Sequence, residues 1–254
     1  MNFAFGAAFI SAKVGVGEFP PLLFTAMRFL IIGLLLIPFL KIHYGQMTNI
    51  LIISFLGGGV HFSFFYLALD NSKYISSVAI VLQLGVPFAT ILSVIFLNEV
   101  IRWRRALGIL FAFSGVIILI FEPTVLNDLG GVYYALLAAF SMSVSLLFMK
   151  KLNDVKVFDL QAWIALISCI FLGLASYFLE QGQNSAIVEA SLKGWIALTF
   201  TALVATGIGH AGFYYLLTKY DVSKITPLTL LAPVLGIINA LIISYFALSL
   251  FPLI

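Results

Sequence analysis

The sequence predicts an all-α fold, a polytopic membrane helix bundle with about nine spans. Of its 254 residues, 63% are hydrophobic and only 9% are charged, against roughly 45–50% and 25% in an ordinary soluble domain. Long apolar runs recur along the chain, and a helix needs about 20 such residues to cross a bilayer. These runs lack the alternation of a membrane β-barrel, so helices are expected to satisfy the backbone polar groups within lipid.

The apolar runs place nine spans along the chain. The first is interpreted as a helix and not a signal peptide, because no basic residue precedes it and the following Lys13 and Glu18 do not form a cleavage site of small residues. In order, the spans are expected at residues 1–17, 20–40, 48–69, 74–97, 104–121, 130–149, 158–179, 194–217 and 225–248.

The connections between spans predict the orientation, because cytoplasmic loops are rich in Lys and Arg. With the N-terminus in the cytoplasm, only Lys73 and Lys193 fall in outer loops. The basic residues then assigned to the inner face are Lys41, Arg102, Arg104, Arg105, Lys150, Lys151, Lys156, Lys219 and Lys224. No charge follows Lys224, so a tenth helix is expected to be missing.

An internal repeat divides the chain into two halves, 1–121 and 130–254, the second incomplete at its C-terminus. The segment His61–Leu67 matches His210–Leu216 as H-x-x-F-[FY]-Y-L, and Tyr74 to Pro87 has the same spacing of thirteen as Tyr220 to Pro233. Similar composition of apolar helices is the alternative explanation. A true duplication would relate the halves by inversion, the geometry of transporters that work by alternating access.

Two basic residues stand within the first two spans. Arg28 lies eight residues into its span, about 12 Å below the outer face at 1.5 Å per residue, and Lys13 reaches a similar depth. Together they could line a site for an anionic group such as a carboxylate. Both could instead extend to the membrane interface.

Two histidines, His61 and His210, lie well inside their spans and form part of the repeat. Because histidine titrates near neutral pH, they are candidates for binding solute or relaying protons. The alternative is a neutral ring hydrogen-bonded to a neighbouring helix.

Other polar and aromatic residues complete the candidate site. Gln83 and Asn239 are uncharged polar groups within spans, which either bind solute or join helices. Tyr66 and Tyr214 either line a cavity or pack. The candidates for helix breaking near the midplane are Pro87, Pro227 and Pro233.

Several function classes are excluded. The chain has no H-E-x-x-H, G-x-S-x-G, intramembrane aspartate pair or P-loop, so no catalytic residue and no enzyme is expected. The single cysteine, Cys169, and three histidines are too few for a metal site. No cofactor and no nucleic-acid partner are expected, which leaves a small-molecule solute and the lipid bilayer as partners.

Short motifs in order resemble the EamA-type transporters of the drug/metabolite transporter superfamily, and in particular exporters of the O-acetylserine/cysteine type. They are Pro20-Pro21-Leu22 with Arg28-Phe29, Leu97-Asn98-Glu99, Leu107-Gly108 with Ser114-Gly115-Val116, and Thr226-Pro227-Leu228-Thr229-Leu230-Leu231-Ala232-Pro233-Val234. The resemblance implies an inverted five-plus-five helix bundle in the bacterial cytoplasmic membrane, exporting amino acids or other small metabolites. The chain departs from the usual pattern of this family in two ways: its first helix is short, and no acidic residue follows the ninth span.

The leading hypothesis is therefore a secondary transporter that exports amino acids or related small metabolites by alternating access, with a homodimer left open. The alternative is a degenerate, non-transporting membrane subunit or a truncated transporter.

Overall fold

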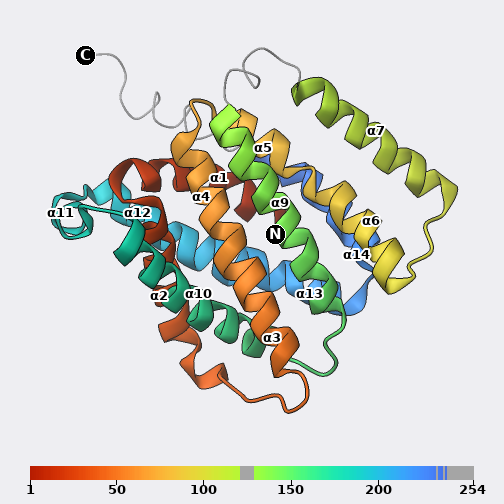
Figure 1. Ribbon diagram of the computed structural model, residues 1–254, viewed down its shortest axis with the longest axis horizontal. Coiled ribbons are helices and arrows are strands. Elements are labelled where there is room, and N and C mark those ends of the chain that lie inside the picture. The colour runs from red at the N-terminus through yellow and green to blue at the C-terminus, as the bar shows by residue number, and fades with distance from the viewer. Residues whose placement is uncertain (121–128, 233, 237, 239–254) are drawn as a thin grey trace.

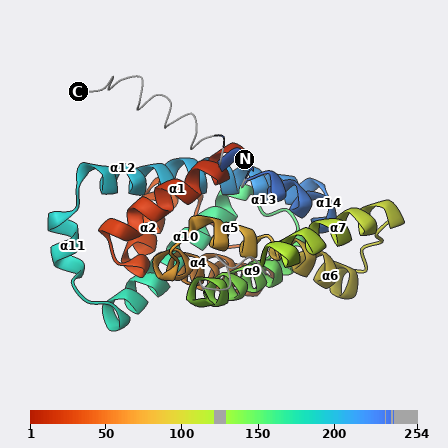
Figure 2. The same ribbon diagram turned by 90° about the horizontal axis from the view of Figure 1, so that it is seen from above.

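The computed structural model describes residues 1–120, 129–232, 234–236 and 238, and it is a polytopic helical bundle. Of the described residues, 85% are helical, and none lies in a strand. The helices lie in two main layers, with α1, α12, α13 and α14 on one side and α4, α6 and α9 on the other (Figures 1 and 2). The predicted all-α membrane fold is confirmed.

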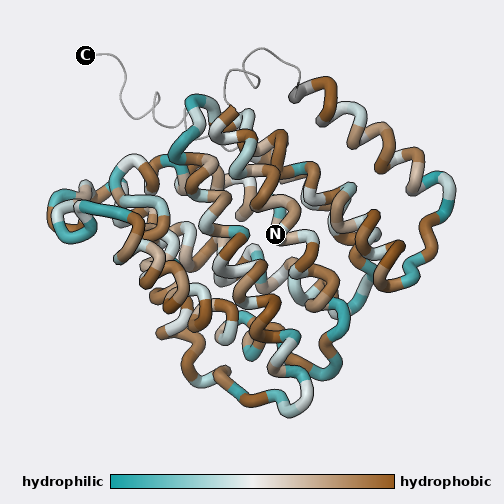
Figure 3. The backbone as a smooth tube through the Cα atoms, viewed as in Figure 1, coloured by the Kyte–Doolittle hydropathy of each residue, from teal (hydrophilic) through white to brown (hydrophobic). Residues whose placement is uncertain are grey.

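The helices follow the predicted spans in order. They are α1 (Asn2–Glu18), α2 (Pro21–Leu36), α3 (Met47–Ile53), α4 (His61–Asn71), α5 (Ile75–Leu82), α6 (Gly85–Leu97), α7 (Trp103–Ile120), α9 (Leu129–Lys150), α10 (Val157–Leu179), α11 (Gln183–Glu189), α12 (Leu192–Phe200), α13 (Ala211–Lys219) and α14 (Val222–Ile225). Six continuous helical segments of the described chain are long and apolar enough to cross a membrane. Hydrophobic residues dominate these segments, and hydrophilic residues gather in the connections (Figure 3).

Two of the predicted spans contain a wider helical turn that leads up to a candidate histidine. The π-helical segment Ser54–Val60 joins α3 to α4 and ends directly before His61, and the π-helical segment Thr201–His210 joins α12 to α13 and ends at His210. Glycines in the first segment bring its backbone close to neighbouring helices, since a Cβ at Gly59 would lie 2.8 Å from the Phe171 ring. Such π-helical turns are frequent at functional sites.

The predicted span 74–97 is broken between α5 and α6. Pro87 has no N–H with which to reach the carbonyl of Gln83 four residues earlier. The Val86 N–H donates to that carbonyl instead, at 3.0 Å, so the chain tightens into a turn at Gln83 and Leu84. The helix therefore breaks one turn before the proline and presents Gln83 at the break.

The ninth predicted span is irregular where it is described. After α14 the chain forms a 3₁₀ helix, Thr226–Leu230, which contains Pro227. Pro233, Asn239 and residues 240–254, on which the expected absence of a tenth helix depends, lie outside the described residues. The short helix α11 was not predicted, because its seven residues are too few and too polar to resemble a span.

Two lysines satisfy the carbonyls at the ends of helices in corresponding parts of the chain. The Lys13 ammonium donates to the carbonyl of Leu69, within the last turn of α4, and to that of Ser72, just after the helix. The Lys150 ammonium donates to the carbonyls of Leu217 and Tyr220, at 3.2 Å and 2.9 Å, at the end of α13. A cation at a helix C-terminus stabilises the unpaired carbonyls there.

Two glutamates cap the beginnings of helices at opposite ends of the bundle. The Glu180 carboxylate accepts from the N–H groups of Leu22 and Leu23 at 2.7 Å and 3.0 Å, at the start of α2. The Glu99 carboxylate accepts from the N–H groups of Val222 and Ser223 at 2.9 Å and 3.1 Å, at the start of α14. Each carboxylate thus satisfies two N–H groups that have no partner within the helix.

The cap at α2 leads to a prediction. Glu180→Gln should destabilise the purified protein by about 1–2 kcal/mol, because an amide keeps one acceptor oxygen but loses the charge. The measurement is thermal unfolding in detergent. The matched control is Glu189→Gln, which removes an exposed carboxylate from α11 and should leave the melting temperature unchanged. Equal melting temperatures for the two variants would contradict the capping role.

Candidate functional site

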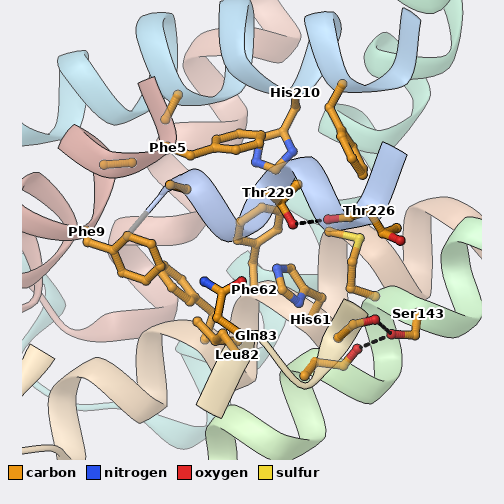
Figure 4. Close-up of a pocket in the computed structure, with 18 of the residues that line it drawn as sticks. Phe5, Phe9, His61, Phe62, Leu82, Gln83, Ser143, His210, Thr226 and Thr229 are labelled. Atoms are coloured by element: carbon orange, nitrogen blue, oxygen red, sulfur yellow. Dashed lines mark hydrogen bonds between the residues drawn. The ribbon is translucent and has the colours of Figure 1, made fainter. Parts of the chain in front are cut away.

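A cavity of about 190 Å³ lies in the interior of the bundle, where both predicted halves contribute side chains. It is walled mainly by apolar and aromatic residues, among them Phe5 and Phe9 of α1 and Phe62 of α4 (Figure 4). Its polar and charged lining residues are Arg28, His61, Tyr66, Gln83, Ser143, His210, Thr226 and Thr229. Drug-sized ligands occupy pockets of about 300–1,000 Å³, so this volume suits a smaller solute.

Arg28 is the charged residue of this lining. It lies in the middle of α2 and is 2% exposed. Its Nη1 donates to the Tyr66 hydroxyl at 2.7 Å, while Nε and Nη2 are buried without a hydrogen-bond partner among the described residues. Two guanidinium donors are thus available for an acceptor, and a carboxylate can accept two parallel hydrogen bonds from one guanidinium.

Aromatic rings surround the Arg28 guanidinium. Its Cζ lies 4.1 Å from the centroid of the Phe62 ring and 5.0 Å from that of Phe29. A cation over an aromatic face is attracted by the electron-rich ring, and the attraction is larger where water is excluded. These rings hold the guanidinium in place and partly offset the free-energy cost of burying it.

The described residues around the cavity supply no carboxylate to balance this charge. The lining contains no acidic residue, and Arg28 makes no ion pair with a described residue. A cation within a membrane-spanning bundle normally has a partner, because leaving it unpaired costs several kcal/mol. The site is therefore complementary to an anion.

The two candidate histidines approach the cavity from different helices (Figure 4). His61 Nδ1 lies 2.8 Å from the carbonyl oxygen of Ala138, so this nitrogen carries the proton and donates it. His210 Nδ1 is buried without a partner among the described residues. The Phe62 ring lies between the two imidazoles, with centroid distances of 4.6 Å to His61 and 5.4 Å to His210.

Gln83 and Tyr66 also line the cavity, as the sequence suggested. Gln83 is presented by the break between α5 and α6 (Figure 4). Tyr66 is fully buried and bonded to Arg28. One cavity thus brings together five of the predicted site residues, which are Arg28, His61, Tyr66, Gln83 and His210.

Other candidates lie elsewhere. Lys13 does not contribute to the cavity, because its long side chain reaches the carbonyls at the end of α4. Tyr214 is buried with its ring 5.8 Å from that of His210, but it borders a separate cavity beside the connection after α9 and not the central one. Pro233 and Asn239 lie outside the described residues.

Three hydroxyl groups of the lining were missed by the sequence interpretation. Thr226 and Thr229 come from the 3₁₀ helix, and Ser143 comes from α9 (Figure 4). The repeat carried a signal for one of them, since Thr229 follows Tyr220 by the same nine residues that separate Gln83 from Tyr74. Serine is too common within membrane helices for Ser143 to be singled out.

Comparison with known proteins gives consistent similarities over most of the chain. The model of the EamA-like transporter family matches residues 1–121 and 129–251. A probable amino-acid metabolite efflux pump of Salmonella typhimurium is 28% identical over 252 residues, covering 94% of this chain and 82% of that protein. The protein of the same name from Escherichia coli K12 is 28% identical over 253 residues, covering 92% and 81%.

Two further similarities extend across the chain. An uncharacterized transporter of Archaeoglobus fulgidus is 27% identical over 240 residues, covering 92% of this chain and 83% of that protein. A solved crystal structure with 20% sequence identity superimposes with a TM-score of 0.75, covering 96% of this chain and 86% of that chain. This last similarity concerns the fold alone.

Proposed function

Because this chain belongs to the EamA-like transporter family, we propose that it exports amino acids or related small metabolites by alternating access. Its relatives are named as transporters of metabolites, and the bundle has several helices able to span a membrane. The family and the helices support a multi-pass membrane protein that acts on a small solute. The direction of transport, the class of solute and alternating access are what we propose in addition.

The observation that carries this proposal is Arg28 in the central cavity. Its two unpartnered donors suit the carboxylate that amino acids and many related metabolites share. The cavity of about 190 Å³ suits a solute of that size. Solute sites of secondary transporters lie near the middle of the bilayer, where the two repeats meet.

Paired features of the two halves support a division into inverted repeats at 1–121 and 130–254. The π-helical turns before His61 and ending at His210 correspond, as do the lysine contacts of Lys13 and Lys150. A third pair consists of two hydrogen bonds at the starts of helices. The Ser191 hydroxyl donates to the Glu18 carboxylate at the start of α12, and the Asn153 N–H donates to the side-chain oxygen of Gln46 at the start of α3. Inverted repeats give two arrangements of similar energy around one site.

The proposed location is the bacterial cytoplasmic membrane with the N-terminus in the cytoplasm. The excess of basic residues in the connections assigned to the cytoplasmic side supports this orientation. A homodimer remains a prediction from the sequence.

The test is solute counterflow in proteoliposomes. Vesicles containing the purified protein, loaded with one unlabelled solute, should accumulate the labelled form of the same solute transiently. The panel comprises amino acids, acetylated amino acids and organic cations, and protein-free vesicles are the control. Exchange of a carboxylated solute is expected. No exchange by monodisperse protein would contradict the proposal and favour a non-transporting subunit.

A further inference from the structure

The net charge of the cavity restricts the kind of solute that it can hold. Arg28 is the one residue of the described lining that is charged at every accessible pH. Of the ten acidic residues, nine lie between the predicted spans, and Asp159 is the second residue of the span 158–179. The acidic residues are Glu18, Asp70, Glu99, Glu122, Asp128, Asp154, Asp159, Glu180, Glu189 and Asp221.

Solutes of different charge leave different net charges in this site. A zwitterionic amino acid brings a carboxylate for Arg28 but also an ammonium group, so the loaded site keeps a net charge of one. A monoanion cancels the guanidinium charge. Because an uncompensated charge is unfavourable in a low-dielectric interior, the site is better matched to the monoanion.

The rest of the described lining offers an ammonium group neutral acceptors and aromatic rings, but no negative charge. The rings of Phe62 and Phe29 already face the guanidinium, at 4.1 Å and 5.0 Å. A second cation on these rings would be repelled by Arg28. The amide of Gln83 and the hydroxyl of Thr229 are neutral polar groups at the cavity. They can hydrogen-bond an amide or ester of the solute, but they cannot cancel the charge of an ammonium group.

We propose that the cavity selects small monocarboxylates with no free ammonium group, such as N-acylated amino acids, and that their transport moves one net negative charge. This inference rests on the proposed function, which it narrows from amino acids and related metabolites to organic monoanions. An inside-negative membrane potential then drives export without a coupling ion. A potential of 100 mV supports about a 50-fold gradient for one charge, equivalent to about 2.3 kcal/mol.

The test compares three solutes that share one side chain: alanine as the zwitterion, N-acetylalanine as the monoanion and alanine methyl ester as the cation. Each solute is added unlabelled at pH 7 and competes with labelled N-acetylalanine for counterflow in proteoliposomes that contain the unaltered protein. N-acetylalanine should compete at a concentration at least about 10-fold lower than alanine, and the methyl ester should not compete. Equal or stronger competition by alanine would overturn the charge inference but leave a transporter in place.

A second measurement tests the movement of charge. In the same vesicles, a potassium gradient with valinomycin sets the membrane potential, and a positive interior should accelerate uptake of labelled N-acetylalanine. Uptake that does not respond to the potential would overturn the electrogenic part. Absence of exchange for every solute of the panel would overturn the proposed function, and this inference with it.

Two variants connect the selectivity to the guanidinium. Arg28→Lys keeps one positive charge and should keep the preference for N-acetylalanine over alanine, with weaker binding. Arg28→Gln removes the charge and should abolish that preference. A preference that survives in Arg28→Gln would overturn the assignment of selectivity to Arg28.

Discussion

Arg28→Gln should raise the apparent KM for a carboxylated solute by about 10- to 150-fold, since a hydrogen bond to a charged group contributes about 1.5–3 kcal/mol. The same substitution should not lower the melting temperature. Arg28 is 2% exposed, with two donors unpartnered and no described acidic partner, so its removal relieves the fold of a buried charge. The measurements are concentration-dependent exchange and thermal unfolding in detergent.

The matched control for this variant is Lys193→Gln. It removes one positive charge from an exposed position at the start of α12 and should leave both exchange and unfolding unchanged. Unaltered exchange by Arg28→Gln would exclude Arg28 from the solute site. A large fall in its melting temperature would instead indicate a structural role.

Gly6→Ala should give the second large effect, on stability. A Cβ at Gly6 would lie 2.5 Å from the Gly236 nitrogen and 2.8 Å from the Ala232 carbonyl oxygen. These are backbone atoms, so α1 must move away from this segment. Overpacking of this kind costs about 1–3 kcal/mol, and the melting temperature should fall by about 2–4 °C per kcal/mol. Exchange should also slow, because α1 carries Phe5 and Phe9 to the cavity.

Gly17→Ala is the control within the same helix. Nothing lies within 4 Å of a Cβ at Gly17, and alanine has the higher helix propensity. Its melting temperature should be unchanged or slightly raised. Similar behaviour of the two alanine variants would show that α1 does not pack closely on the segment around Gly236.

The fold could be predicted from the sequence because lipid permits few solutions. Apolar runs of span length indicate helices directly, and the described helices follow the predicted spans. The π-helical turns before His61 and at His210 could not be predicted, because they depend on packing between helices. The break at Gln83 was predicted only through Pro87, and it lies one turn earlier.

The candidate site was partly predictable for a similar reason. A polar residue deep in a span must face the interior, and on this ground Arg28, His61, His210 and Gln83 could be chosen. The depth of a residue in a span does not give the direction of its side chain. The sequence therefore groups Lys13 with Arg28, whereas the Lys13 ammonium reaches carbonyls at the end of α4.

Alternating access to the cavity can be measured directly at Thr229, which lines the cavity and comes from the second half of the chain (Figure 4). Thr229→Cys in a Cys169→Ala background would be treated with a membrane-impermeant maleimide in right-side-out and in inside-out membrane vesicles. Labelling in both preparations is predicted, with protection by N-acetylalanine that is lost in Arg28→Gln. Labelling in only one preparation, unaffected by N-acetylalanine, would contradict a carrier with a central solute site.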